Sequence, residues 1–341
     1  MKGGETMKRA VKAMSLLSLG VALLLGVVSH APAAEPITVN VLAAWPKSAP
    51  VVEFFVKDFV EGLQKKANEK YPGQLKLVMK GGPEVVATNE QINAVQKGMV
   101  DLIYTSFSYY VSKMPELDVE NVSPLKPWEE KAVGLYDYWE KLHNEKTSTH
   151  FLGRNGTGLT FQIGLTKPIK SINELKGMSI RVNPTTVTVI RALGGNPVQM
   201  APAEVYQGLE RNIVQGHVTP AFMLRTLGLD KVTKHLLFPG FFDTNNVIIA
   251  NLDKWKKLPK HLQDLFSDHT DLHTRNMFAF NQEEEKKELA IYKAAGMGFI
   301  ELPKAEADRF LKIANDAVVK VAMDKAPNEV KKMLEYFSKK P

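Results

Sequence analysis

The sequence lacks cysteine altogether, with none among its 341 residues. This absence excludes disulfides, thiolate metal sites, cysteine nucleophiles and the lipidated cysteine that tethers many exported proteins to a membrane. After the N-terminal region, no apolar run approaches the roughly 20 residues that a transmembrane helix needs. We therefore predict a mature chain without disulfides and without a membrane anchor.

Enzyme signatures are also missing. The sequence has no GxSxG elbow, no phosphate-binding GxxxxGK[ST] loop and no GxGxxG followed by an acid. His269 and His273 are spaced to share a helix face, but Thr270 stands where a zinc protease needs its general-base glutamate. We predict no catalytic residues, no metal and no cofactor. The alternative is a chance pair of carboxylates, which turnover of a bound compound would reveal.

The N-terminal segment has the three parts of a secretory signal. A basic start precedes an apolar stretch and then small residues suited to cleavage: Lys2, Lys8, Arg9 and Lys12, then Met14–Val28, then Ala31-Pro32-Ala33. We predict a signal peptide over residues 1–33 and export of the mature protein. Retention of this segment as an anchor is the alternative, although its apolar stretch is short for a membrane span.

Positive charge is in mild excess. The net charge of +7 falls to +4 when residues 1–33, with four basic residues and one acid, are removed. Lysines are interspersed with glutamates, as in the runs KKANEK and EEEKKE. Such mixing is typical of solvated helix faces rather than of a nucleic-acid interface. We predict no nucleic-acid partner.

Short apolar strands alternate with amphipathic helices, which indicates an α/β fold. In the stretch Ile172–Gly216, SIRV reads as a strand, TTVTVIRAL as a helix ended by Gly194 and Gly195, PVQM as a second strand, and the segment after Pro202 as a second helix. This order places Arg181 inside a strand and aims it at the carboxyl end of a sheet. Ligands of open α/β folds bind at that end.

The same stretch carries a family pattern. The runs LKGMSIRV, LGGNPVQM and EVYQGLERNIVQG resemble the signature of the substrate-binding proteins of tripartite ATP-independent periplasmic (TRAP) transporters, and the segments Gly81–Leu102 and Asn246–Pro259 resemble other parts of that family. The resemblance implies a periplasmic, monomeric receptor that captures an organic anion, usually a carboxylate, and passes it to a membrane permease. A receptor for a membrane sensor kinase, or the binding protein of an ATP-driven importer, is the alternative.

The resemblance also implies how the chain is divided. The expected fold is a two-lobed periplasmic binding protein, each lobe a sheet flanked by helices. We assign residues 36–158 and 246–284 to lobe I, residues 159–245 and 285–320 to lobe II, and residues 321–341 to a C-terminal helix. Residues 260–295 form a helical pattern about 50 Å long. In this family a comparable helix spans both lobes.

Arg181 matches the ligand-binding arginine of the family. A guanidinium presents a planar fork of donors that fits a carboxylate bidentately. Loss of water around such a pair strengthens it, although desolvation of both ions offsets part of the gain. The sequence leaves open the alternative that Arg181 pairs with a protein acid such as Glu204 or Glu210.

One departure from the family pattern concerns charge in the pocket. Many members carry a second ligand-binding arginine about twenty residues before the first, and here that position is Phe161. Phe222 and Trp45 are further apolar candidates, and Trp45 either stacks on the ligand or covers the core. This set predicts a monocarboxylate with an apolar or aromatic body.

A second departure concerns cations. The family's VDGxExP stretch reads VQGHVTP here, so Gln215 and Val218 replace two acids. Members that hold their ligand through a cation recruit a carboxylate from this stretch, so a cation-bridged ligand is disfavoured. Thr219 and His217 remain as candidate hydrogen-bonding partners of the ligand.

Four more residues are candidate ligand contacts. Tyr104 follows a predicted strand and belongs either to the core or to the cleft. Asn245 and Asn246 lie at the predicted return to lobe I, where they either contact the ligand or satisfy hinge backbone groups. Glu84 either contacts the ligand or caps the segment that follows it.

Overall fold

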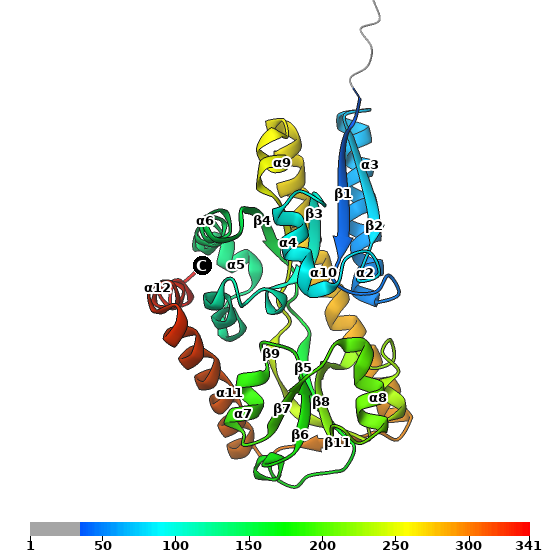
Figure 1. Ribbon diagram of the computed structural model, residues 1–341, viewed down its shortest axis with the longest axis vertical. Coiled ribbons are helices and arrows are strands. Elements are labelled where there is room, and N and C mark those ends of the chain that lie inside the picture. The colour runs from blue at the N-terminus through cyan, green and yellow to red at the C-terminus, as the bar shows by residue number, and fades with distance from the viewer. Residues whose placement is uncertain (1–34) are drawn as a thin grey trace, which may run out of the picture. The chain divides into compact units, whose positions relative to one another are not determined.

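The computed structural model describes residues 35–341, and the predicted signal peptide (1–33) lies outside the described residues. Two β-sheets are joined by a long helix (Figure 1). The prediction of a two-lobed α/β fold with a helix that spans both lobes is confirmed. Lobe I is the part built on the first sheet, and lobe II is the part built on the second.

The sheet of lobe I has five strands in the order β2-β1-β3-β10-β4. β1 runs parallel to β2 and β3, whereas β10 is antiparallel to β3 and β4. Every residue of β3 and β10 is buried, as expected for central strands covered on both faces. The strands are β1 (Ile37–Ala43), β2 (Leu75–Gly81), β3 (Leu102–Ser106), β4 (Thr149–Arg154) and β10 (Asn246–Asn251).

The sheet of lobe II has six strands in the order β11-β9-β5-β8-β6-β7. β6 runs parallel to β7 and β8, β5 is antiparallel to β8 and β9, and β11 is parallel to β9. The strands are β5 (Thr160–Leu165), β6 (Ser179–Val182), β7 (Asn196–Gln199), β8 (Gly216–Pro220), β9 (His235–Asp243) and β11 (Gly298–Glu301).

Helices cover both faces of each sheet, and each face has its own apolar core. The α-helices are α2 (Pro50–Phe54), α3 (Gly62–Lys70), α4 (Gln91–Gln96), α5 (Pro127–Ala132), α6 (Leu135–Thr147), α7 (Val187–Ala192), α8 (Val205–Glu210), α9 (Leu252–Lys257), α10 (Lys260–Ala294), α11 (Lys304–Lys325) and α12 (Pro327–Phe337). The π-helix η1 (Phe55–Glu61) joins α2 to α3, and short 3₁₀ helices include η3 (Phe107–Tyr109) and η4 (Pro115–Val122).

Two helices run from one lobe to the other. α10 has 35 residues; Leu262 and Phe266 near its start lie in a core of lobe I, and Tyr292 near its end lies in a core of lobe II. α11 runs in the opposite sense, with Phe310 in a core of lobe II and Ala322 in a core of lobe I. The lobes are therefore connected by helices as well as by the chain between β4 and β5 and between β9 and β10.

Local turn chemistry explains where two helices end. The sequence predicts one helix over residues 128–142, but Gly134 adopts a left-handed φ of +84° and separates α5 from α6. Of the two glycines expected after α7, Gly194 has the left-handed conformation, with φ at +82°. The nitrogen of Gly195 then donates to the carbonyl of Ile190, which closes the helix end.

A buried ion cluster lies where β4 ends, beside the first connection between the lobes. The Arg154 guanidinium donates to both carboxylate oxygens of Glu130 at 2.8 and 2.9 Å and lies 2.6 Å from Glu120. Burial is the largest influence on Glu120 and raises its pKa, while Arg154 opposes that rise and Glu130 adds to it. One guanidinium thus contacts two buried carboxyl groups, and its positive charge favours their ionised forms.

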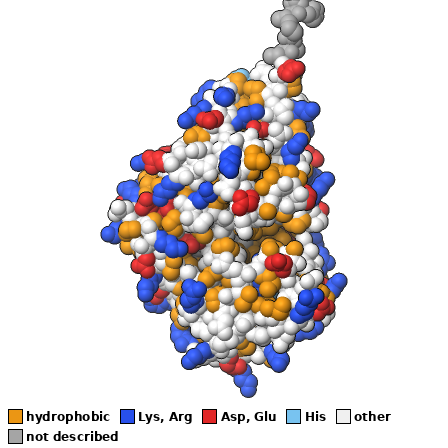
Figure 2. All heavy atoms as spheres, in the orientation of Figure 1, with side chains coloured by type: hydrophobic (Ala, Val, Ile, Leu, Met, Phe, Trp, Pro, Cys, Tyr) orange, Lys and Arg blue, Asp and Glu red, His pale blue; other side chains and the backbone are white. Residues whose placement is uncertain are grey.

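The surface carries charges of both signs. On the face drawn in Figure 2, basic and acidic side chains are interspersed, and apolar side chains gather around a hollow at mid-height. Within residues 35–341, no helix combines the length and apolar character needed to cross a membrane.

Candidate ligand-binding site between the lobes

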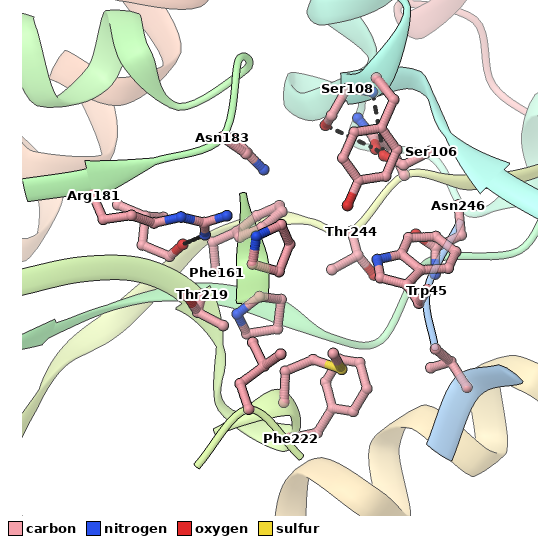
Figure 3. Close-up of a pocket in the computed structure, with 18 residues that line it drawn as sticks. Trp45, Ser106, Ser108, Phe161, Arg181, Asn183, Thr219, Phe222, Thr244 and Asn246 are labelled. Carbon is pink, nitrogen blue, oxygen red and sulfur yellow. Dashed lines mark hydrogen bonds between the residues drawn. The ribbon is translucent and has the colours of Figure 1, made fainter. Parts of the chain in front are cut away.

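A cavity lies between the two sheets, with about 610 Å³ of empty space, part of it continuous with solvent. Its walls come from the carboxyl ends of strands in both lobes, as Figure 3 shows. Seven of the predicted site residues line it: Trp45, Phe161, Arg181, Thr219, Phe222, Asn245 and Asn246.

Arg181 is the only charged residue among the described residues that line this cavity. It projects from β6, its side chain is buried, and only 5% of the residue is exposed. Its Nε donates to the Met200 carbonyl at 3.0 Å and its Nη1 to the Val218 carbonyl at 3.1 Å. These bonds fix the guanidinium plane and leave its remaining donors facing the cavity (Figure 3).

The alternative pairing of Arg181 with a protein acid is wrong. Across residues 35–341, no carboxylate oxygen lies within 4.0 Å of its guanidinium, because Glu204 accepts a bond from the Ala201 nitrogen and Glu210 one from Tyr206. Burial lowers the pKa of Arg181 to about 10, so the side chain is charged at neutral pH. A buried cation without a counter-charge is costly, and an anionic ligand would relieve that cost.

The remaining walls are largely apolar. Phe161 and Phe222 are buried at the cavity, and Val51, Met223 and Leu227 lie beside them. The Trp45 ring packs edge-on against Tyr104, with ring centroids 5.3 Å apart, and its centroid is 5.9 Å from that of Tyr109. Trp45 therefore does both things that the sequence left open, because it covers the core of lobe I and lines the cavity.

Three predicted contact residues do not line the cavity. Tyr104 is fully buried beneath Trp45, where its hydroxyl accepts a hydrogen bond from Asn246 at 3.1 Å. His217 is buried and its Nε2 bonds the Thr233 hydroxyl at 2.8 Å. Glu84 is exposed and accepts a bond from the Gly82 nitrogen at 2.7 Å. For Tyr104 and Glu84 these contacts correspond to the core and local alternatives that the sequence left open, whereas the bond of His217 to Thr233 was not anticipated.

Asn245 and Asn246 line the cavity, but their side chains also hold the connection between the lobes. The Asn245 carboxamide accepts from Ser106 and donates to Asn121 at 3.1 Å. The Asn246 amide is committed to Tyr104. Their hydrogen-bonding capacity is thus largely used within the protein.

Sequence reasoning missed several polar residues at this site. They share one property, which is that each lies at or just beyond the carboxyl end of a strand: Ser106, Ser108, Asn183 and Thr244. That position is itself the signal that could have identified them, because the carboxyl ends of neighbouring strands meet at the ligand. Tyr109 also lines the cavity, and it lies in the aromatic run after β3.

A hydrogen bond joins the lobes at the cavity wall. The buried hydroxyl of Thr185, in the loop after β6, donates to the Ser108 hydroxyl of lobe I at 2.8 Å. The Ser108 hydroxyl in turn lies 3.4 Å from the side-chain oxygen (Oδ1) of Asn245, at the crossing between the lobes. This chain of contacts favours the arrangement in which the two lobes enclose the cavity.

We expect Thr185→Val to weaken ligand binding by about 2- to 10-fold, because an intramolecular hydrogen bond contributes roughly 0.5–1.5 kcal/mol. The loss should appear mainly as faster dissociation in stopped-flow fluorescence, since the variant keeps every residue that lines the cavity. Thr188→Val is the matched control, because the buried Thr188 hydroxyl has no hydrogen-bond partner within residues 35–341. An equal effect of the two substitutions would contradict a role for the inter-lobe bond.

The described residues contain no group of three or more histidine, aspartate and glutamate side chains arranged to hold a metal ion. At the stretch where cation-binding members place an acid, Val218 presents only its carbonyl, which accepts from Arg181. Arg181, the charged residue among the described lining residues, gives the cavity a positive group that suits an anion.

The two sheets, the helices that connect them and the cavity at their junction define a two-lobed solute-binding protein. The chain belongs to bacterial extracellular solute-binding protein family 7, whose family model matches residues 48–325, and it is a TRAP-transporter substrate-binding protein. The resemblance predicted from the sequence motifs is confirmed.

Similar proteins fit this assignment. A monocarboxylate 2-oxoacid-binding periplasmic protein of Nostoc sp. is 28% identical over 67% of this chain, and the match spans 63% of that relative, under two thirds of its length. The fold is also similar to a TRAP solute-binding protein of Desulfovibrio salexigens with bound orotic acid, with a TM-score of 0.79, 16% identity and coverage of 88% and 97% of the two chains. A third protein, from Bordetella bronchiseptica with calcium and picolinate, has a TM-score of 0.76, 20% identity and coverage of 89% and 91%.

Proposed function

We propose that this protein is a periplasmic receptor that binds an organic monocarboxylate with an apolar or aromatic body between its lobes and delivers it to a TRAP membrane permease. The observation that carries the proposal is Arg181, a buried guanidinium at the cavity with no carboxylate partner within the described chain. A ligand carboxylate supplies the missing charge and fits the guanidinium fork.

The restriction to one carboxylate follows from the rest of the cavity. A second ligand carboxylate would be buried without a cation, because the other described lining residues are uncharged. Phe161 occupies a position where many family members have a second arginine, and its buried ring adds apolar surface. An apolar or aromatic ligand body gains free energy by leaving water for these walls.

The names of the similar proteins are compatible with this class. The Nostoc relative is named for monocarboxylate 2-oxoacids, and the two similar structures contain orotic acid and picolinate. The transport role, the periplasmic location and action as a monomer rest on family membership. An ATP-driven importer's binding protein is less favoured, because its lobes are usually joined by crossing strands and here α10 spans both lobes. We infer a binding role without catalysis.

The direct test is thermal unfolding of the protein, stripped of carried-over ligand, against mono- and dicarboxylates with and without calcium. A ligand at about 100 times its Kd stabilises the folded state by about 2.7 kcal/mol, which raises the Tm by several degrees. We expect this shift with aromatic or branched monocarboxylates, independent of calcium. A shift with dicarboxylates alone would contradict the monocarboxylate assignment, a calcium requirement would contradict direct binding to Arg181, and no shift with any acid would overturn the receptor proposal.

A further inference from the structure

Asn183 is a polar residue of the cavity with unused hydrogen-bonding capacity. It lies two residues after Arg181, directly beyond the carboxyl end of β6, and it lines the same cavity. Figure 3 shows its side chain on the same side of the cavity as Arg181, with the amide nitrogen directed towards the cavity.

The orientation of the Asn183 amide is fixed by its neighbour. Its Oδ1 accepts two hydrogen bonds from Thr186, one from the backbone nitrogen and one from the hydroxyl, both at 2.9 Å. A backbone N–H can only donate, so the oxygen of Asn183 must face Thr186 and the NH₂ group must face the other way. No acceptor within residues 35–341 bonds that NH₂ group, which leaves two donors for a ligand.

The other amides and hydroxyls of the cavity differ in this respect. Asn246 donates to Tyr104, and the Thr244 hydroxyl donates to the Gly156 carbonyl. Ser106 and Asn245 bond each other. Thr219, which lies on β8 opposite Gln162 of β5, is an exception in lobe II, because its buried hydroxyl has no partner in the described part of the chain. Among the described lobe II residues of the cavity, Asn183 and Thr219 therefore have unused hydrogen-bonding capacity.

We propose that Asn183 is a specificity-determining residue that donates a hydrogen bond to an uncharged oxygen of the ligand close to its carboxylate. The substrate class is then a 2-oxo or 2-hydroxy monocarboxylic acid with a branched or aromatic body. This inference rests on the proposed function, because it assumes that Arg181 holds the carboxylate.

Three physical arguments select this class. Two residues along a strand separate their Cα atoms by only about 6.6 Å, so Arg181 and Asn183 reach ligand atoms that are a few bonds apart. The Asn183 NH₂ group is a neutral donor, which matches a keto or hydroxyl oxygen. A 2-amino acid would instead place an ammonium group near Arg181, in a cavity whose described lining offers no carboxylate to pair with it.

The test is isothermal titration calorimetry with four ligands that share one carbon skeleton: 4-methyl-2-oxopentanoate, 2-hydroxy-4-methylpentanoate, 4-methylpentanoate and leucine. We expect the wild-type protein to bind the oxo or hydroxy acid about 10-fold more tightly than the unsubstituted acid, in line with one added hydrogen bond and one unpaired polar group avoided. Leucine should bind more weakly than any of the other three.

Two variants distinguish the Asn183 donor from the Thr186 hydroxyl that orients it. In Asn183→Ala the preference for the oxygenated acid over 4-methylpentanoate should fall to about 2-fold or less. Thr186→Val is the matched control, because it removes the hydroxyl that bonds Asn183 but keeps the backbone bond and the free NH₂ group. The preference should persist in it.

Each other outcome overturns the inference in a recognisable way. Equal affinity of the wild-type protein for oxygenated and unsubstituted acids would show that no donor of the protein bonds the added oxygen. Tight binding of leucine would contradict the proposed substrate class. A preference that survives Asn183→Ala assigns it to another residue. If none of the four ligands binds while a different monocarboxylate does, the substrate class is wrong but the receptor function stands; if no carboxylate binds, the proposed function fails as well.

Discussion

Arg181→Ala is expected to weaken carboxylate binding by about 100-fold or more while the protein still folds. Truncating one partner of a buried, hydrogen-bonded charge pair typically costs about 2–5 kcal/mol, much of it because the other charge is left unpaired. In the ligand-free protein the same substitution removes a buried cation that has no carboxylate partner, and it loses only the bonds to the Met200 and Val218 carbonyls. Titration calorimetry and the thermal unfolding of the ligand-free variant measure the two effects.

Two other arginine variants show whether the geometry of the guanidinium or its charge alone is needed, and whether the effect is specific to Arg181. Arg181→Lys keeps the charge but loses the planar fork, so it should recover only part of the affinity. Arg191→Ala removes an exposed arginine of the same lobe, at the end of α7, and should leave binding unchanged. Affinity in Arg181→Ala within a few-fold of wild type would contradict the assignment of this guanidinium to the ligand carboxylate.

The second large effect is expected on stability. Arg154→Met should lower the free energy of unfolding by about 3–5 kcal/mol, because it leaves the buried carboxylate of Glu130, which Arg154 bonds through both oxygens, without its cation. Urea denaturation measures the loss. Lys131→Met is the control for an ion pair at the surface, where Lys131 and its partner Asp271 are each 47% exposed, and it should cost no more than about 1 kcal/mol.

The same cluster predicts a dependence of stability on pH. Burial raises the pKa of Glu120 above its ordinary value of 4.5, so the folded protein holds a proton that the unfolded chain releases. The resulting stability is fully present below the ordinary value and is lost as the pH rises towards the raised one. The Tm should therefore fall as the pH rises from about 5 to about 8, and it should level off above that, where Glu120 is ionised in both states.

Glu120→Gln separates this group from the others. The glutamine amide resembles a protonated carboxyl group, so the variant should retain most of its stability near neutral pH and show a flatter dependence of Tm on pH over the same range. A pH dependence equal to that of the wild type would show that Glu120 is ionised in the folded protein, and would contradict its raised pKa.

The sequence placed several features of the site correctly because their signals are local. The strand and helix pattern around Arg181 appears in the structure as β6, α7, β7 and α8 in that order. The long helix expected over residues 260–295 is α10, Lys260–Ala294. Periodicity and turn residues are properties of short segments, and they survive folding unless tertiary contacts override them.

The sequence alone determined the fold class, the family and the position of Arg181 in a strand, because each depends on residue types at fixed spacings along the chain. Only the tertiary structure decided which polar groups are already paired and which are free. Asn245 bonds Ser106 across 139 residues of sequence, whereas the NH₂ group of Asn183 has no acceptor within residues 35–341. The sequence likewise gave no sign of the Arg154 cluster. A polar residue's role depends on which partners folding brings within hydrogen-bonding distance, and spacing along the chain does not contain that information.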